Sequence, residues 1–174
     1  MTKAESREWV ERRVAREWLM RFLYSLDVQK METQDLDDWF CVFDARNDTE
    51  EEAPFAAADG EEHADPWPVK EEAHHLRAGQ KTFIRNGAKS VLDNLEEIDE
   101  HIVRHLKGWE YTRLPKVDRA ILRMAVAEIL YHEEIPVGAS INEAVELSKR
   151  YSSDTSFRFL NGVLGNIARE VEES

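Results

Sequence analysis

The chain has 174 residues, 42% of them apolar and 34% charged, which fits one folded unit or two small ones sharing a core and excludes a large multidomain enzyme. Apolar runs of only a few residues exclude an integral membrane protein, and the first residues resemble neither a secretory signal nor a transit peptide. A single cysteine, Cys41, excludes an internal disulfide. We therefore expect a cytoplasmic protein that is stabilised by ordinary packing.

The formal net charge of -13 is distributed unevenly along the chain. Residues 27–75 hold 16 acidic and three basic side chains and account for the whole excess, whereas the first 26 residues hold six basic and four acidic ones. Exposed charges are screened over about 8 Å at physiological salt, so a basic face away from the acidic segment can still attract a polyanion. The net charge therefore does not exclude a nucleic acid as partner.

The first predicted element is an amphipathic helix over residues 6–29, which contain no Gly or Pro and carry apolar side chains at spacings of three and four. Residues 35–43 are compatible with a short helix. The acidic stretch near 44–68 has no apolar periodicity, and its composition is typical of a loop.

Helical spacing of apolar residues predicts five more helices, over 69–92, 95–106, 117–131, 140–151 and about 155–171. The helix over 117–131 is apolar almost all round, which places it in the middle of a bundle. Ser140 and Glu143 match a capping box at the start of the next helix, and Asp154 or Thr155 can cap the last one. Because no segment alternates like a strand, the predicted fold class is all-α with about seven helices.

Three blocks of sequence resemble the NusB transcription antitermination factors. The first is Arg-Arg-Val-Ala-Arg-Glu at 12–17 followed by Phe-Leu-Tyr at 22–24, and the second is Val-Asp-Arg-Ala-Ile-Leu-Arg-Met-Ala at 117–125 with Glu128. The third combines Ile-Pro at 135–136, Ile-Asn-Glu-Ala-Val-Glu-Leu-Ser-Lys at 141–149 and Phe-Leu-Asn-Gly-Val-Leu at 159–164. The sequence at 97–99 and Trp109 add to the resemblance, which is specific over residues 80–170 and weaker before them.

The resemblance implies an all-helical adaptor of two lobes, with no catalytic chemistry and no cofactor. The N-terminal lobe would span 1–92, including the acidic loop, and a C-terminal helical bundle would span 93–174. Members of the family bind the boxA sequence of nascent single-stranded RNA together with NusE, a small-subunit ribosomal protein, so that the transcribing RNA polymerase complex reads through terminators in ribosomal operons. Carried over by position, the resemblance implies RNA contacts at Arg12, Arg13, Arg16, Arg158 and Phe159, and a NusE contact at Asp118.

The spacing of Arg12, Arg13 and Arg16 predicts that their guanidinium groups meet solvent together on one face of the first helix. Guanidinium groups can bind two phosphate oxygens at once and can stack on unpaired bases, which suits single-stranded RNA. The alternative is that these arginines form ion pairs on the helix surface with Glu8, Glu11 and Glu17. With the resemblance, we favour RNA contact.

Tyr24 and Phe159 are aromatic candidates for stacking on bases, although Phe159 also falls in an apolar stripe that is typical of core packing. Asp118 sits where a carboxylate favours a helix N-terminus, which is compatible with a partner contact. His101 and His105 are four residues apart, but a solvated helix face is the favoured interpretation and no metal is expected.

Two alternatives to an RNA-binding adaptor remain open. The chain could be a protein-only scaffold that has lost RNA binding, as the glutamates of the first helix suggest. It could also be a stand-alone relative of the RNA-binding domain of ribosomal RNA cytosine methyltransferases, although no Gly-rich turn is present to bind a methyl donor. We also expect the acidic stretch 48–65 to compete with RNA for the arginine face.

Overall fold

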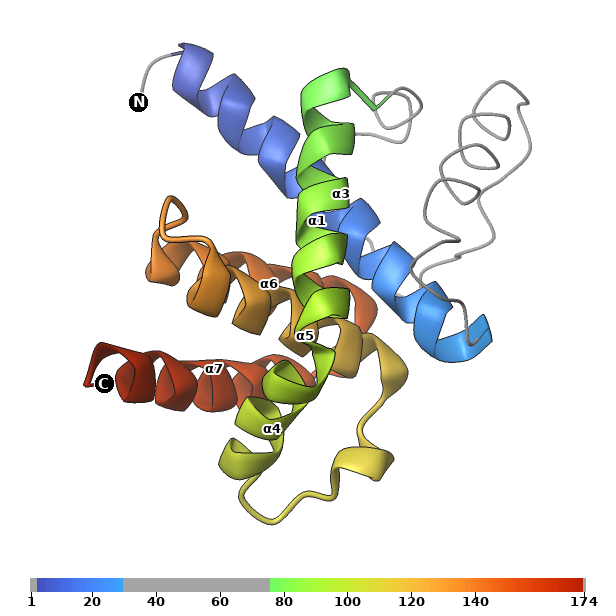
Figure 1. The fold of residues 1–174 in the computed structure, drawn as a ribbon, viewed down its shortest axis with the longest axis vertical. Coiled ribbons are helices and arrows are strands. Elements are labelled where there is room, and N and C mark those ends of the chain that lie inside the picture. The colour runs from blue at the N-terminus through green and yellow to red at the C-terminus, as the bar shows by residue number, and fades with distance from the viewer. Residues whose placement is uncertain (1–2, 30–75, 174) are drawn as a thin grey trace.

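The computed structural model describes residues 3–29 and 76–173 of the chain (Figure 1). Within these residues there are six α-helices and one 3₁₀ helix, namely α1 (Lys3–Gln29), α3 (Ala78–Asp93), α4 (Leu95–His105), η1 (Tyr111–Arg113), α5 (Lys116–Tyr131), α6 (Val137–Tyr151) and α7 (Ser156–Glu172). The all-α prediction is confirmed, and the predicted helices agree with the observed ones to within a few residues where both are described. The predicted short helix at 35–43 and the acidic stretch near 44–68 lie outside the described residues.

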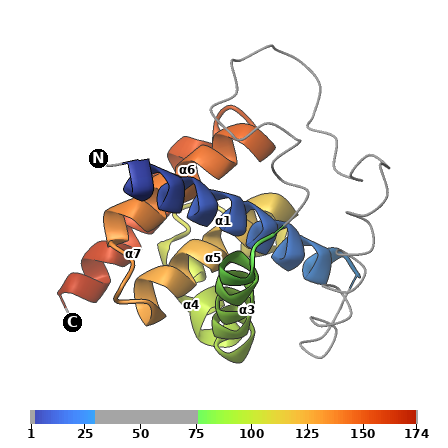
Figure 2. The ribbon, with the colours of Figure 1, turned by 90° about the horizontal axis from the view of Figure 1, so that it is seen from above.

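Helix α5 lies at the centre of the fold, as its apolar sequence predicts. It packs against α1, α3, α4, α6 and α7, so helices surround it on several sides (Figure 2). Its side chains Ile121, Leu122, Ala125 and Val126 have no exposed surface at all. A helix that is apolar almost all round is stable in water only when other helices cover most of its faces, and five helices pack on α5.

One hydrophobic core continues through the described helices, from Val14 on α1 through α5 to Ile167 on α7. Figure 1 shows α1 and α3 crossing above α5, with α6 and α7 lying beside each other below them. The predicted lobe boundary at residues 92/93 falls beside Asn94, which separates α3 from α4. That boundary stays a prediction, because α5 contributes to the packing on both sides of it.

Helix α6 begins three residues earlier than predicted, and the expected capping box at Ser140 and Glu143 is wrong. Pro136 occupies the N-cap position with φ -58°, so the helix starts at Val137. Ser140 and Glu143 are instead buried inside the fold. At the start of α7, Thr155 takes the N-cap position as predicted, but its side chain makes no capping hydrogen bond.

Candidate nucleic-acid interface

Arg13 and Arg16 are buried, so the prediction that three guanidinium groups meet solvent together is wrong for these two. Arg13 is 5% exposed and donates from Nε and Nη2 to the two carboxylate oxygens of Glu143, both at 2.9 Å. Arg16 is 4% exposed and donates from Nε and Nη2 to Glu128 at 2.8 and 3.2 Å. Both ion pairs are therefore two-pronged and join α1 to the core of the bundle.

The reason for this burial is the way α1 lies across its neighbours. Helix α1 packs on α5 and α3 and also reaches α6, so its packed surface is wider than a single amphipathic stripe. Charged side chains in such a place must be paired, and Glu128 and Glu143 supply the partners. Glu128 is one of several charged residues of α5, together with Lys116, Asp118, Arg119 and Arg123, so the sequence did not single it out as the partner of Arg16.

Arg12 is the member of the predicted cluster that is exposed. It lies close enough to the connection between α5 and α6 to act on Glu134. The pKa of Glu134 is lowered by hydrogen bonds from its own backbone amide and from His132, and the positive charge of Arg12 adds to this effect. Arg12 therefore brings positive charge to the surface where α1 passes this connection.

A second group of side chains on α1, which sequence reasoning missed, lies where α1 meets the end of α6. The guanidinium carbon of Arg21 lies 4.4 Å from the centre of the Trp18 ring, and Nη2 donates to Tyr151 Oη at 2.9 Å and to Glu17 Oε1 at 2.5 Å. Tyr24, one turn further on, is partly buried and packs on the hydrophobic core. The C-terminal half of α1 is thus anchored beside the corner between α6 and α7.

The corner between α6 and α7 combines basic and aromatic side chains. Arg158 is exposed, and its guanidinium carbon lies 5.5 Å from the centre of the Phe157 ring. Lys149 Nζ lies 5.6 Å from the same ring. Phe159 packs partly on the core, and its ring centre is 5.4 Å from that of Trp109. Lys149 and Phe157 are additions that the sequence pattern alone did not indicate, and we give the name aromatic corner to Lys149, Phe157, Arg158 and Phe159.

Asp118 is buried, with 2% of its surface exposed, so the carboxylate does not face a partner on the surface of this structure. It lies in the first turn of α5, as predicted, but beneath the junction of α6 and α7. Burial raises the pKa of Asp118, and hydrogen bonds from Ser152 and Ser156 oppose part of that rise. The sequence indicated the helix N-terminus correctly, and it could not show that another part of the chain covers it.

This buried carboxyl gives a testable pH dependence. Because the pKa of Asp118 is raised by folding, the folded protein keeps this proton to a higher pH than the unfolded chain does. The stability contributed by the protonated form is therefore lost as the pH rises above the usual Asp pKa near 4 and through the raised pKa of the folded protein. We therefore expect the free energy of unfolding of the wild type, measured against Asp118→Asn by urea titration, to fall as the pH is raised from about 3 to about 7. A difference that is independent of pH would contradict this account.

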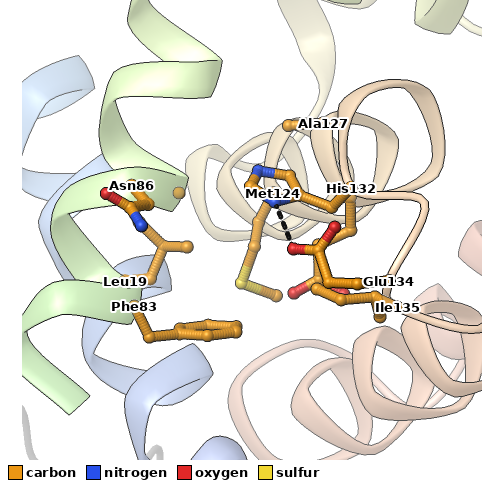
Figure 3. A pocket seen from close by; sticks show the side chains of 10 residues that line it. Leu19, Phe83, Asn86, Met124, Ala127, His132, Glu134 and Ile135 are labelled. Atoms are coloured by element: carbon orange, nitrogen blue, oxygen red, sulfur yellow. Dashed lines mark hydrogen bonds and ion pairs between the residues drawn. The ribbon is translucent and has the colours of Figure 1, made fainter. Parts of the chain in front are cut away.

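A small cavity of about 60 Å³ lies between α1, α3 and the end of α5 (Figure 3). It has room for a few water molecules and not for a metabolite. Beside it, His132 hydrogen-bonds Ser90 Oγ through Nε2 at 2.9 Å and Glu134 Oε1 through Nδ1 at 3.0 Å. Ser90 lies inside α3, where the backbone amides are hydrogen-bonded within the helix and cannot form an oxyanion hole for catalysis. The hydrogen bonds from Ser90 to His132 and from His132 to Glu134 therefore serve as a structural link between α3 and the α5–α6 connection.

His101 and His105 are partly buried between α4 and α7 and are not on a solvated face. His101 Nδ1 and His105 Nε2 each lie 3.4 Å from Glu170 Oε2. In the part of the chain that the structure describes, no three His, Cys, Asp or Glu side chains are grouped so that they could hold a metal ion. The same residues include no helix long and apolar enough to cross a membrane.

Comparison with known proteins places this arrangement in a family. Residues 13–169 match the NusB family. Transcription antitermination protein NusB of Thermoanaerobacter sp. (strain X514) is 35% identical over 161 residues, which cover 92% of this chain and 92% of the relative. The solved structure of T. maritima NusB has a TM-score of 0.67 at 28% identity and covers 91% of each chain. A structure of the antitermination factors NusB and NusE in complex with double-stranded RNA shares the fold, with a TM-score of 0.67 at 23% identity over 92% of this chain and 97% of that one. The chain belongs to the NusB family.

Proposed function

We propose that this chain is a non-catalytic, cytoplasmic RNA-binding adaptor of transcription antitermination. Its ligand is boxA-like single-stranded RNA from ribosomal operons, which it binds together with NusE as part of the transcribing RNA polymerase complex. Membership of the NusB family supports the general role, and the fold is shared with a NusB protein that has been solved with NusE and RNA. The surface residues of this chain supply the argument for RNA.

The observation that carries the proposal is the aromatic corner. Arg158 and Lys149 place two positive charges beside Phe157, and Phe159 lies on the same turn of α7. Single-stranded RNA offers both phosphates and unpaired bases, and proteins bind it by combining cations with aromatic rings. Acidic side chains also lie here, because Glu146 Oε1 is 2.7 Å from Lys149 Nζ and Asp154 is exposed in the α6–α7 connection, so part of the positive charge is compensated.

On α1 the proposed contacts are Arg12, which is exposed, and Tyr24, which is partly buried. Arg13 and Arg16 act as structural supports in this proposal, because their guanidinium groups are occupied by Glu143 and Glu128. The hydrogen bond between Arg21 and Tyr151 holds the C-terminal half of α1 beside the end of α6, and Tyr24 lies about one turn after Arg21 on α1. One strand of RNA could therefore contact both helices.

Titration of labelled boxA-like RNA over a range of salt concentrations tests this proposal. We expect Arg158→Ala and Arg12→Ala to weaken binding, and each lost phosphate contact should reduce the slope of log affinity against log salt by about 0.7. Arg169→Ala is the matched control, because Arg169 is an exposed arginine in the last turn of α7, far along the helix from Arg158. Equal affinities for all three variants and the wild type would contradict the proposed surface.

A protein-only scaffold is the second candidate function, and the burial of Arg13 and Arg16 favours it. In that case the chain would bind NusE and show no measurable affinity for RNA, either alone or with NusE. The same titration, performed with and without NusE, distinguishes the two functions. Detectable RNA binding that depends on Arg158 excludes the scaffold.

A further inference from the structure

Trp109 is the most exposed large apolar side chain of the described residues. It is 56% exposed, ahead of Val103 at 51% and Val28 at 45%. Single exposed aliphatic side chains are common on protein surfaces, but an indole carries much more apolar area and is enriched where proteins contact ligands. The exposure of this ring therefore calls for an explanation that the fold itself does not supply.

The structure holds Trp109 in a defined position. Gly108 before it has φ 79°, a left-handed backbone conformation that turns the chain after α4. The Trp109 ring lies 5.4 Å from the Phe159 ring at an angle of 46° between planes. Two residues later, the hydroxyl of Tyr111 donates to Asp99 Oδ1 at 2.5 Å, which fixes the chain beyond. The indole is thus supported on one side by Phe159 and open to solvent over the rest.

The charges near Trp109 indicate the kind of partner. Lys107 and Arg113 are exposed and lie within four residues of Trp109 along the chain, and Arg158 is the neighbour of Phe159. Glu110 is the acidic side chain in this loop. The balance is positive in a protein whose net charge is -13. Lys107 and Arg113 flank Trp109 along the chain, and an exposed aromatic ring in a basic loop fits a ligand that is polyanionic and has flat rings of its own, as single-stranded RNA does.

We propose that Trp109 stacks on a base of bound single-stranded RNA and extends the aromatic corner from α7 to the loop between α4 and η1. This inference rests on the proposed function, because it assigns a further contact to the same RNA. The support from Phe159 means that the indole is ordered before RNA binds, so little conformational entropy is lost on binding. Phe159 then serves both as a candidate stacking residue and as the support of a second one.

Variants at Trp109 test the inference in the full-length chain with labelled boxA-like RNA and NusE. Because stacking on one base is worth about 1 to 3 kcal/mol, Trp109→Ala should weaken RNA binding by about ten-fold or more, while the slope of log affinity against log salt stays unchanged. Trp109→Phe should restore most of the affinity. Val103→Ala removes a similarly exposed apolar side chain from α4 and should leave affinity unchanged. Ultraviolet crosslinking of RNA to the unaltered protein should yield a crosslinked peptide that contains Trp109.

Three results would overturn the inference, and they can be told apart. If Trp109→Ala binds RNA like the wild type while Arg158→Ala is weakened, the stacking role is wrong and the proposed function stands. If Trp109→Ala loses affinity for NusE alone, the indole is a protein contact and the RNA assignment is wrong. If the wild type binds no RNA with or without NusE, the proposed function itself has failed.

Discussion

Replacing Arg16 with methionine is expected to lower the free energy of unfolding by about 3 to 5 kcal/mol, because it leaves a buried carboxylate without its counter-charge. Glu128 is 4% exposed and accepts two hydrogen bonds from Arg16 and one from Ser140 Oγ, at 2.6 Å. Ser140 alone cannot balance the charge of Glu128 in that environment. Urea unfolding followed by circular dichroism measures the loss.

The double variant Arg16→Met/Glu128→Gln is the control for this experiment. It removes both charges and keeps an oxygen at position 128 that can accept the hydrogen bond from Ser140. Buried ion pairs replaced by neutral groups of similar size are often close to neutral in stability, so we expect the double variant to recover at least half of the loss. A single variant that loses less than about 1 kcal/mol would mean that Glu128 finds water or another partner, and the structural role of Arg16 would then be wrong.

This result bears on how RNA binding should be measured. The Arg13–Glu143 ion pair is buried in the same way as the Arg16–Glu128 pair. Substitution of either arginine is therefore expected to lower the fraction of folded protein, and this alone would reduce the measured RNA affinity. Loss of RNA affinity in Arg13 or Arg16 variants is therefore not evidence of contact unless the folded fraction is measured as well. Arg12, which is exposed on the same helix, allows the two effects to be separated.

The helices were predictable from the sequence because their signals are local. The apolar stripe at 117–131 and its position at the centre of the bundle follow from residues within α5 itself. The inward direction of Arg13 and Arg16 was not predictable, because it depends on which helices α1 crosses. Their partners are 130 and 112 residues away in the chain. The spacing of residues within α1 suggested its own glutamates as the alternative ion-pair partners of these arginines. No local sequence pattern indicates that α1 crosses α5 and α6.

Some residues of the candidate site could likewise be identified from the sequence, and others are brought together only by the fold. Arg158 and Phe159 could be selected from the sequence because they lie beside each other in a block that resembles the family. Trp109 comes near them only through the fold, since the loop after α4 meets the first turn of α7. Asp118 shows the opposite error: its place at a helix start was visible in the sequence, and the cover provided by the α6–α7 junction was not.

Asp99→Ala is expected to lower the free energy of unfolding by about 2 to 3 kcal/mol, the range for charged hydrogen bonds at a partly buried site. Asp99 on α4 accepts hydrogen bonds from Arg123 Nε and Nη2 at 2.8 and 2.7 Å and from Tyr111 Oη at 2.5 Å. The Arg123 side chain is 13% exposed. A weaker contact of 3.7 Å with Asp27 Oδ1 remains in the variant, so the loss should be smaller than for Arg16.

Tyr111→Phe separates the two functions of Asp99. Burial, and then the hydrogen bond to Asp99, raise the pKa of Tyr111, so its hydroxyl stays protonated and donates at any pH near neutral. Removing that hydroxyl should cost about 0.5 to 1.5 kcal/mol, and the ion pair with Arg123 would persist. If Asp99→Ala and Tyr111→Phe lose equal stability in urea unfolding, Arg123 contributes nothing through Asp99, and the proposed link from α4 to α5 is wrong.

The same pair of variants links stability to the proposed RNA site. Tyr111 lies two residues after Trp109, and its hydrogen bond to Asp99 holds the loop against α4. If Trp109 binds RNA as an ordered ring, Tyr111→Phe should weaken RNA binding slightly while leaving the salt slope unchanged, since no charge is altered. Asp99→Ala should weaken binding more at the same folded fraction, because it releases the Tyr111 hydroxyl and also removes the two hydrogen bonds from Arg123 to Asp99. Unchanged affinity in both variants, with Trp109→Ala still impaired, would show that the indole finds its place without this anchor and that Phe159 alone positions it.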